Sequence, residues 1–141
     1  MEYSRFENNL VVRLDKGDEI CDALLKIAEA EQISCAAVTG IGATDNFCVG
    51  VFDIDKKAYD KYDFKGANYE ITSLCGNLTR MNGKAYQHLH MTCAGSEGRV
   101  VGGHLLNAVI SLTCEITLSI IEGSVSRQRD ASLGINKISF E

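Results

Sequence analysis

The histidines of this sequence are the residues whose placement most directly suggests chemistry. The chain contains three, and all of them lie between positions 88 and 104. His88 and His90 are two positions apart, so on a β-strand both side chains point to the same face of the sheet. Neutral imidazole is a zinc ligand, and three protein ligands with an open fourth position are typical of a catalytic zinc site. The spacing suggests a metal site if His104 lies near the other two.

Two turns predict where the histidine-bearing strands lie. Asn82-Gly83 is the sequence expected for a two-residue type I′ turn, which would join a strand at 69–81 to a strand that ends at 94. Ser96-Glu97-Gly98 predicts a three-residue loop in which Gly98 adopts the left-handed conformation. The two turns therefore predict three consecutive antiparallel strands.

The second loop also predicts which residues face each other. If Gly95 and Arg99 flank it, their numbers add to 194 (95 + 99), so His90 faces His104. Facing Cβ atoms are about 4.5–5.5 Å apart. The sequence thus predicts that His88, His90 and His104 are the ligands of a divalent metal ion, with zinc as the expected metal. The simpler alternative is that they are ordinary polar side chains, because a His-x-His pair alone is a weak signal.

Glu115 is the candidate acid or base. In the predicted strand 109–121, the even positions are apolar from Ile110 onward and the odd positions are polar, with Glu115 as the one charge in the middle. Three roles remain open for it: a fourth metal ligand, a general base for water on the metal, or a residue that faces solvent.

The elements that must position these residues form one α+β domain over residues 1–141. Helical spacing of apolar residues predicts a helix from Gly17-Asp18, with Asp18 as its N-cap, to about Gln32. Gly40-Ile41-Gly42 is interpreted as a strand break, and residues 126–132 as a short helix. The predicted strands cover residues 3–14, 34–39, 47–53, 58–64, 69–81, 86–94, 99–104, 109–121 and 135–140.

Composition indicates a globular cytoplasmic protein. Hydrophobic residues make up 45% of the chain and charged residues 23%, which is near the average for such proteins. Apolar stretches such as 49–52 are much shorter than the ~20 residues of a membrane span, and Glu2, Arg5 and Glu7 replace the apolar run of a secretory signal. The six cysteines contain no Cys-x-x-Cys pair, so we expect buried, reduced thiols.

The charge of the chain argues against extensive contact with nucleic acid. The net charge is −5, whereas nonspecific affinity for nucleic acid depends on lysine and arginine. Two local groups of basic residues remain, one at positions 56–65 and one formed by Arg127 and Arg129. Solvated surface charge is the simpler interpretation of both groups.

Several ordered motifs resemble the PPC domain, the domain conserved in plants and prokaryotes, from about Arg5 to Phe140. The motifs are Val38-Thr39-Gly40-Ile41-Gly42-Ala43, Tyr69-Glu70-Ile71-Thr72-Ser73-Leu74-Cys75-Gly76-Asn77, His88-Leu89-His90 and Gly98-Arg99-Val100-Val101-Gly102-Gly103-His104-Leu105. The resemblance implies a mixed, mainly antiparallel sheet flanked by helices, assembled as a homotrimer. It also implies the three-histidine pattern of prokaryotic members, which His88, His90 and His104 match one for one.

Two functions follow from this resemblance. The histidine arrangement is similar to that of the acetolactate decarboxylase group, which binds zinc through three histidines, and this implies a metal-dependent lyase or hydrolase. The family also carries a DNA-binding label, but its plant members use a separate AT-hook rich in Arg, Gly and Pro. This chain has no proline and no such segment.

Three hypotheses result. The first is a metalloprotein that binds or transforms a small molecule, with Glu115 as acid or base. The second is a DNA-associated regulator whose trimer collects basic segments from three chains. The third is an assembly or sensor module without chemistry. Charge and the missing hook favour the first over the second.

Overall fold

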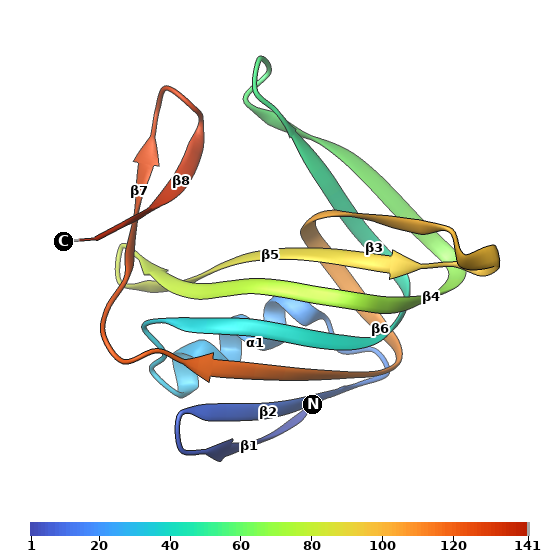
Figure 1. Cartoon of the computed structure of the whole chain (residues 1–141), viewed down its shortest axis with the longest axis horizontal. Coiled ribbons are helices and arrows are strands. Elements are labelled where there is room, and N and C mark those ends of the chain that lie inside the picture. The colour runs from blue at the N-terminus through green and yellow to red at the C-terminus, as the bar shows by residue number, and fades with distance from the viewer. Residues whose placement is uncertain (141) are drawn as a thin grey trace.

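The computed structural model describes residues 1–140 of the 141-residue chain. One helix and eight strands account for most of it (Figure 1). Their bounds are β1 Glu2–Phe6, β2 Asn9–Asp15, α1 Ile20–Ala30, β3 Ala36–Asp53, β4 Ala58–Met81, β5 Lys84–Ala94, β6 Val100–Ile120, β7 Ser126–Asp130 and β8 Ile135–Ser139. A single turn of 3₁₀-helix at Ser96–Gly98 joins β5 to β6.

Six strands form one sheet in the order β1-β2-β6-β3-β4-β5, and β6 pairs with β5 as well. The pairs β6–β3, β3–β4, β4–β5 and β5–β6 therefore form a closed circuit of four strands. Every strand pair in residues 1–140 is antiparallel. The expected α+β single domain agrees with this structure, but the mixed sheet does not, and one helix replaces the several that we expected.

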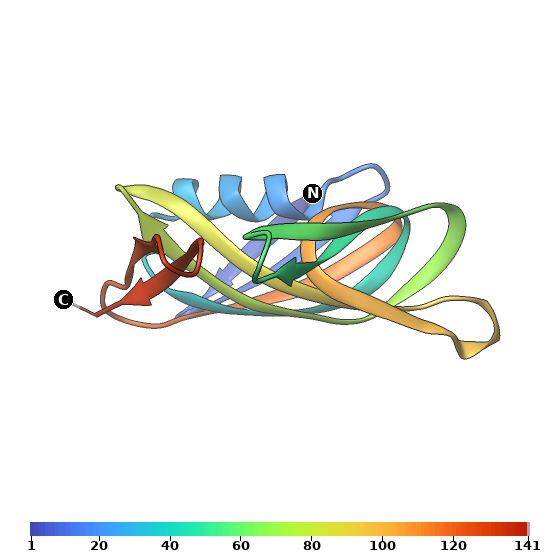
Figure 2. The ribbon, with the colours of Figure 1, turned by 90° about the horizontal axis from the view of Figure 1, so that it is seen from above.

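Helix α1 covers one face of the sheet (Figure 2). Its apolar side chains recur at helical spacing and are buried against the inward-facing residues of β5 and β6, including Leu89 and Met91. The N-cap is Glu19, whose carboxylate accepts a hydrogen bond from the Asp22 backbone N–H at 2.7 Å. The predicted N-cap, Asp18, is wrong because its carboxylate instead accepts from the Asp15 N–H at 2.9 Å and pairs with the N-terminal ammonium.

The three longest strands are continuous where the sequence predicted interruptions. Strand β3 runs through Gly40-Ile41-Gly42, and the glycines appear there as an irregularity in register rather than as a strand break. Strand β6 likewise shifts register opposite β3 between Cys48, which pairs with Asn107, and Val49, which pairs with Leu105. A bulge of this kind adds one residue to one strand and reverses the alternation of its side chains. In β6 the buried residues are therefore odd-numbered before the bulge (Leu105) and even-numbered after it (Ala108).

Residues 126–139 form a β-hairpin, so the short helix predicted at 126–132 is wrong. Strand β7 pairs with β8, and Asp130 closes the turn by accepting hydrogen bonds from the backbone of Ser132 and Leu133. The hairpin stands at one end of the sheet and contacts β4 (Figure 1). Its position depends on Arg127, which is 6% exposed and donates to Thr79 Oγ1 at 2.8 Å and to Asn77 Oδ1 at 2.7 Å.

The expected burial of the cysteine thiols is found at five of the six positions. All six cysteines are free thiols; Cys75 is exposed and the other five are buried. Among the described residues, no helix combines the length and the apolar character that crossing a lipid bilayer demands.

Candidate metal centre

The predicted turns place the histidine-bearing strands as expected. Asn82 and Gly83 both have positive φ, 51° and 78°, as a type I′ turn requires. After the second loop, Ala94 pairs with Val100 and His90 pairs with His104, so the register derived from the sequence is confirmed. His88 lies two residues before His90, on the face of the sheet opposite the buried Leu89.

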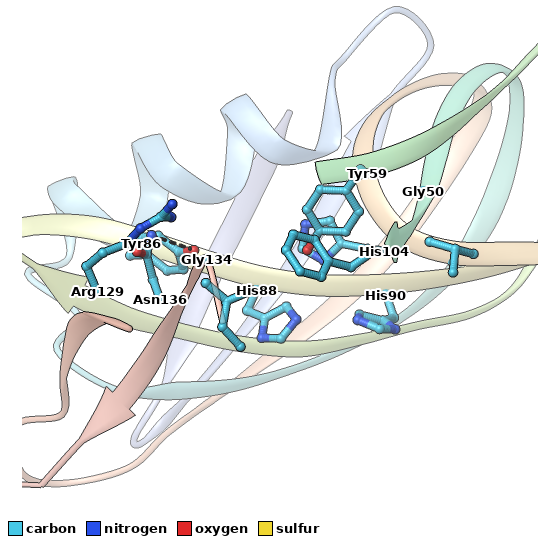
Figure 3. Close-up of a pocket in the computed structure, with 13 residues that line it drawn as sticks. Gly50, Tyr59, Tyr86, His88, His90, His104, Arg129, Gly134 and Asn136 are labelled. Carbon is cyan, nitrogen blue, oxygen red and sulfur yellow. Dashed lines mark hydrogen bonds between the residues drawn. The ribbon is translucent and has the colours of Figure 1, made fainter. Parts of the chain in front are cut away.

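The three imidazoles converge on one point (Figure 3). Their ring centroids are separated by 5.3 Å (His88–His90), 5.2 Å (His88–His104) and 5.5 Å (His90–His104). One nitrogen from each ring lies within 4.8 Å of the others. In a tetrahedral zinc site with Zn–N bonds of about 2.0–2.1 Å, the nitrogens are about 3.4 Å apart. Binding zinc therefore requires the rings to close on the ion by about an ångström.

A cavity of about 500 Å³ lies over the three histidines. Its floor is formed by β5 and the start of β6. One wall is the hairpin formed by the end of β3 and the start of β4, with Phe52 and Tyr59, and the other is the β7–β8 hairpin, with Arg129 and Asn136. Lys57 of the first hairpin donates to the Ala131 carbonyl of the second at 3.3 Å, so the two walls touch.

The environment of His88 and His104 favours their neutral forms. Burial lowers the pKa of His104 from 6.5 to about 4, and the nearby His88 and His90 contribute to the shift. Burial, the charge of Arg127 and His90 also lower the pKa of His88. Neutral imidazole is the form that binds metal.

His104 is held in place but lacks a polar partner. The ring of Tyr59 stacks on it with centroids 4.6 Å apart and an interplanar angle of 18°. Its Nδ1 atom is buried without a hydrogen-bond partner in residues 1–140. A buried polar atom of this kind is costly, and it belongs to one of three imidazoles whose nitrogens lie close together. These residues fit a divalent metal ion.

We expect acid to destabilise the metal-free protein through His104. The folded-state pKa of about 4 lies below the unfolded value of 6.5, so the unfolded chain takes up its proton first. The contribution of neutral His104 to folding stability is complete above pH 6.5 and is lost as the pH falls towards 4. Urea unfolding of EDTA-treated protein checks this: the midpoint falls over that pH range in the wild type and falls less in His104→Gln. Equal pH dependence in both proteins would contradict the assignment.

Glu115 lies away from the histidines. It is exposed on β6, and in the strand register it lies opposite Arg13 of β2 and Ile41 of β3. It lines a second pocket with Thr39 and Cys75. It does not line the cavity over the histidines. Within a single chain, Glu115 therefore cannot reach a metal ion bound by them.

Sequence reasoning missed the residues in the walls of the cavity. Tyr59 received no role, and Arg127 and Arg129 were interpreted as solvated charge. The one available signal was the i, i+2 spacing of the two arginines, which places both on the same face if the segment is a strand. The prediction of a helix there concealed it.

Comparisons with known proteins identify relatives of the whole chain. The family model of the Plants and Prokaryotes Conserved (PCC) domain matches residues 1–122. A structure from Bacteroides thetaiotaomicron, described as that of a protein proposed to bind DNA, is 31% identical, with a TM-score of 0.94 over 99% of this chain and 96% of its own. A protein from Archaeoglobus fulgidus described as metal-containing is 29% identical, with a TM-score of 0.85 over 96% of this chain and 95% of its own.

A more distant likeness concerns the fold alone. Acetolactate decarboxylase from Bacillus subtilis is 18% identical, with a TM-score of 0.60 over 86% of this chain, and the match covers 57% of the decarboxylase. No curated protein matches the sequence.

Proposed function

Because the chain belongs to the Plants and Prokaryotes Conserved (PCC) domain family, we propose that it is a metalloprotein of that family in which His88, His90 and His104 hold one divalent metal ion, with zinc as the expected ion. The observation that carries this proposal is the convergence of three imidazole nitrogens within 4.8 Å of one another at the floor of a cavity. The relative from Archaeoglobus fulgidus, described as metal-containing, supports it.

The cavity suits a small molecule. A divalent ion with three protein ligands acts as a Lewis acid on a ligand oxygen at its open position. Other residues of the chain position a ligand and line the cavity: Tyr59 holds His104 by stacking, while Phe52 and Ile135 provide apolar walls. A metal-dependent lyase or hydrolase is the reaction class that we propose, supported by the fold-level likeness to acetolactate decarboxylase.

Metal analysis tests the metalloprotein proposal. We expect tag-free protein to contain about one zinc or other divalent ion per chain after dialysis against zinc, and none after EDTA. Titration with cobalt(II) should give the intense visible bands of a four- or five-coordinate nitrogen site. Protein that remains metal-free after dialysis, with no cobalt spectrum, would rule the proposal out.

We also propose that the chain forms a homotrimer. The face of the sheet opposite α1 exposes the apolar side chains of Val11 (51% exposed) and Ile41 (58%). Apolar patches of this kind are buried in symmetric oligomers. Glu115 lies on the same face, so its proposed role as acid or base requires a second copy to bring it to the histidines. If sedimentation equilibrium gave the mass of a single chain, both the homotrimer and the role of Glu115 as acid or base would be refuted.

DNA binding is the second candidate, favoured by the description of the Bacteroides relative as a protein proposed to bind DNA. The basic residues of this chain support it poorly. Lys56 pairs with Asp53 and Asp60, at 3.1 Å and 3.0 Å, and Arg127 is buried. Measuring the affinity for duplex DNA over a series of salt concentrations tests this candidate. An affinity that falls steeply with salt would support phosphate contacts, and no binding at low salt would exclude them.

A further inference from the structure

The cavity over the histidines has no acidic residue among its described lining, although the chain contains 19 acidic and 14 basic residues. The acidic residues that directly follow lining residues in the sequence are engaged elsewhere. Asp53 and Asp60 pair with Lys56, and Asp130 pairs with Lys137 at 2.7 Å. No carboxylate of residues 1–140 therefore lines the cavity to balance positive charge inside it.

Positive charge accumulates there once a metal is bound. Three neutral imidazoles leave a divalent ion its full charge of +2, and Arg129, which lines the same cavity, adds one more. The guanidinium of Arg129 is exposed and has no hydrogen-bond or ion-pair partner among residues 1–140. Figure 3 shows Arg129 near Tyr86 and Asn136 at one end of the cavity, with His90 and His104 at the other and His88 between them.

A second cation lies behind this end of the cavity. The buried guanidinium of Arg127 makes only neutral contacts: with Thr79 Oγ1, with Asn77 Oδ1, with the Asn136 carbonyl at 2.9 Å, and over the ring of Tyr86 at 4.7 Å. Buried charges are normally paired with an opposite charge. Arg127 has no acidic partner in the part of the chain that the structure describes.

The same end also contains an unused polar atom. Asn136 donates from Nδ2 to the Tyr86 hydroxyl at 3.4 Å, while its Oδ1 atom is buried without a partner in the described chain. Buried polar atoms usually have a partner. The Oδ1 atom accepts hydrogen bonds and therefore needs a donor, whereas the two arginines without acidic partners are what indicate an anionic group at this end.

We propose that the β7–β8 hairpin forms an anion subsite, in which Arg129 binds the carboxylate of a small organic acid whose other end reaches the metal at His88, His90 and His104. This inference rests on the proposed metal site and assigns its substrate class. Arg127 contributes background positive charge, and Arg129 makes the direct contact through its planar pair of N–H donors.

A carboxylate fits better than a phosphate. Phosphate sites in proteins combine several cations or use backbone N–H groups at the N-terminus of a helix. Here one exposed guanidinium is available, and α1 lies against the opposite face of the sheet (Figure 2). A single planar guanidinium matches a singly charged carboxylate, and the apolar walls accommodate the carbon chain of the acid.

The test uses probes that reach both ends of the cavity. The monohydroxamates of succinic, glutaric and adipic acid carry a metal-binding hydroxamate and a terminal carboxylate, and their terminal amides are uncharged controls. Titration calorimetry with zinc-loaded protein gives each affinity. We expect one chain length to bind at least about tenfold more tightly as the acid than as the amide, and we expect this ratio to fall to about 1 in Arg129→Gln.

Two further variants isolate the contact. Lys137→Gln removes one positive charge from the same hairpin without touching the cavity lining, and we expect it to retain the preference for the acid. Arg129→Lys should retain part of it. Equal affinities for acid and amide in the wild type, or an unchanged ratio in Arg129→Gln, would overturn the subsite. If neither probe bound and zinc were absent, the metal site itself would have failed.

Discussion

Replacing His90 with alanine is expected to lower the affinity of the protein for zinc by a factor of more than about 100. Loss of a group that merely orients a metal ligand typically costs 10–100-fold, and a ligand itself contributes more. Only two histidines would remain, and both are partly buried on neighbouring strands. Competition with a chromophoric chelator measures the affinity directly.

Two variants serve as controls for this prediction. Thr92→Ala alters the next residue on the same face of β5, outside the cavity lining, and should retain the wild-type affinity. Glu115→Gln should also retain the zinc affinity, because Glu115 is proposed as an acid or base rather than as a ligand and lines a different pocket of its own chain. His90→Ala protein that kept its zinc affinity would show that the ion binds elsewhere.

Replacing Gly76 with alanine is expected to cost about 3 kcal/mol or more of folding stability. Gly76 has a φ of 152°, which L-residues rarely adopt, and an added Cβ would collide with the carbonyl oxygen of His88 and lie 2.9 Å from the Leu89 Cα. Strained backbone and overpacking each cost about 1–3 kcal/mol. Because the collision is with β5, the substitution should also displace the strand that carries two of the histidines and weaken metal binding.

Gly66→Ala is the matched control for that effect. Gly66 lies on the same strand with a φ of 80°, and no atom lies within 4 Å of the position of its added Cβ. It should cost only the ~1–2 kcal/mol of the left-handed conformation. Urea unfolding compares the two variants, and equal losses would show that the contact between Gly76 and His88 is not tight.

The sequence predicted the cluster of three histidines because short-range signals determine it. Asn82-Gly83 and Gly98 fix the connections before and after β5, and connections of known length fix the strand register. Three histidines within residues 88–104 then meet without any assumption about distant parts of the chain. The amphipathic helix was predictable for the same reason, since its periodicity is local.

The walls of the cavity could not be predicted because they depend on contacts between distant segments. Tyr59 reaches His104 across 45 positions (104 − 59), and Arg127 reaches Thr79 across 48. The alternation of strand 109–121 correctly placed Glu115 away from the core. It did not reveal the bulge near Leu105, nor how far along β6 Glu115 lies from His104.

The β7–β8 hairpin lies beyond residue 122, where the match to the family model ends, while all three histidines lie before it. Under the proposed function, the floor that would hold the metal and the wall that would contact the ligand can therefore diverge at different rates. A substitution at Arg129 would then change which molecules bind in the cavity and leave the histidine-bearing strands unchanged. Relatives with the same three histidines and a different hairpin would accordingly share a cofactor but not a substrate.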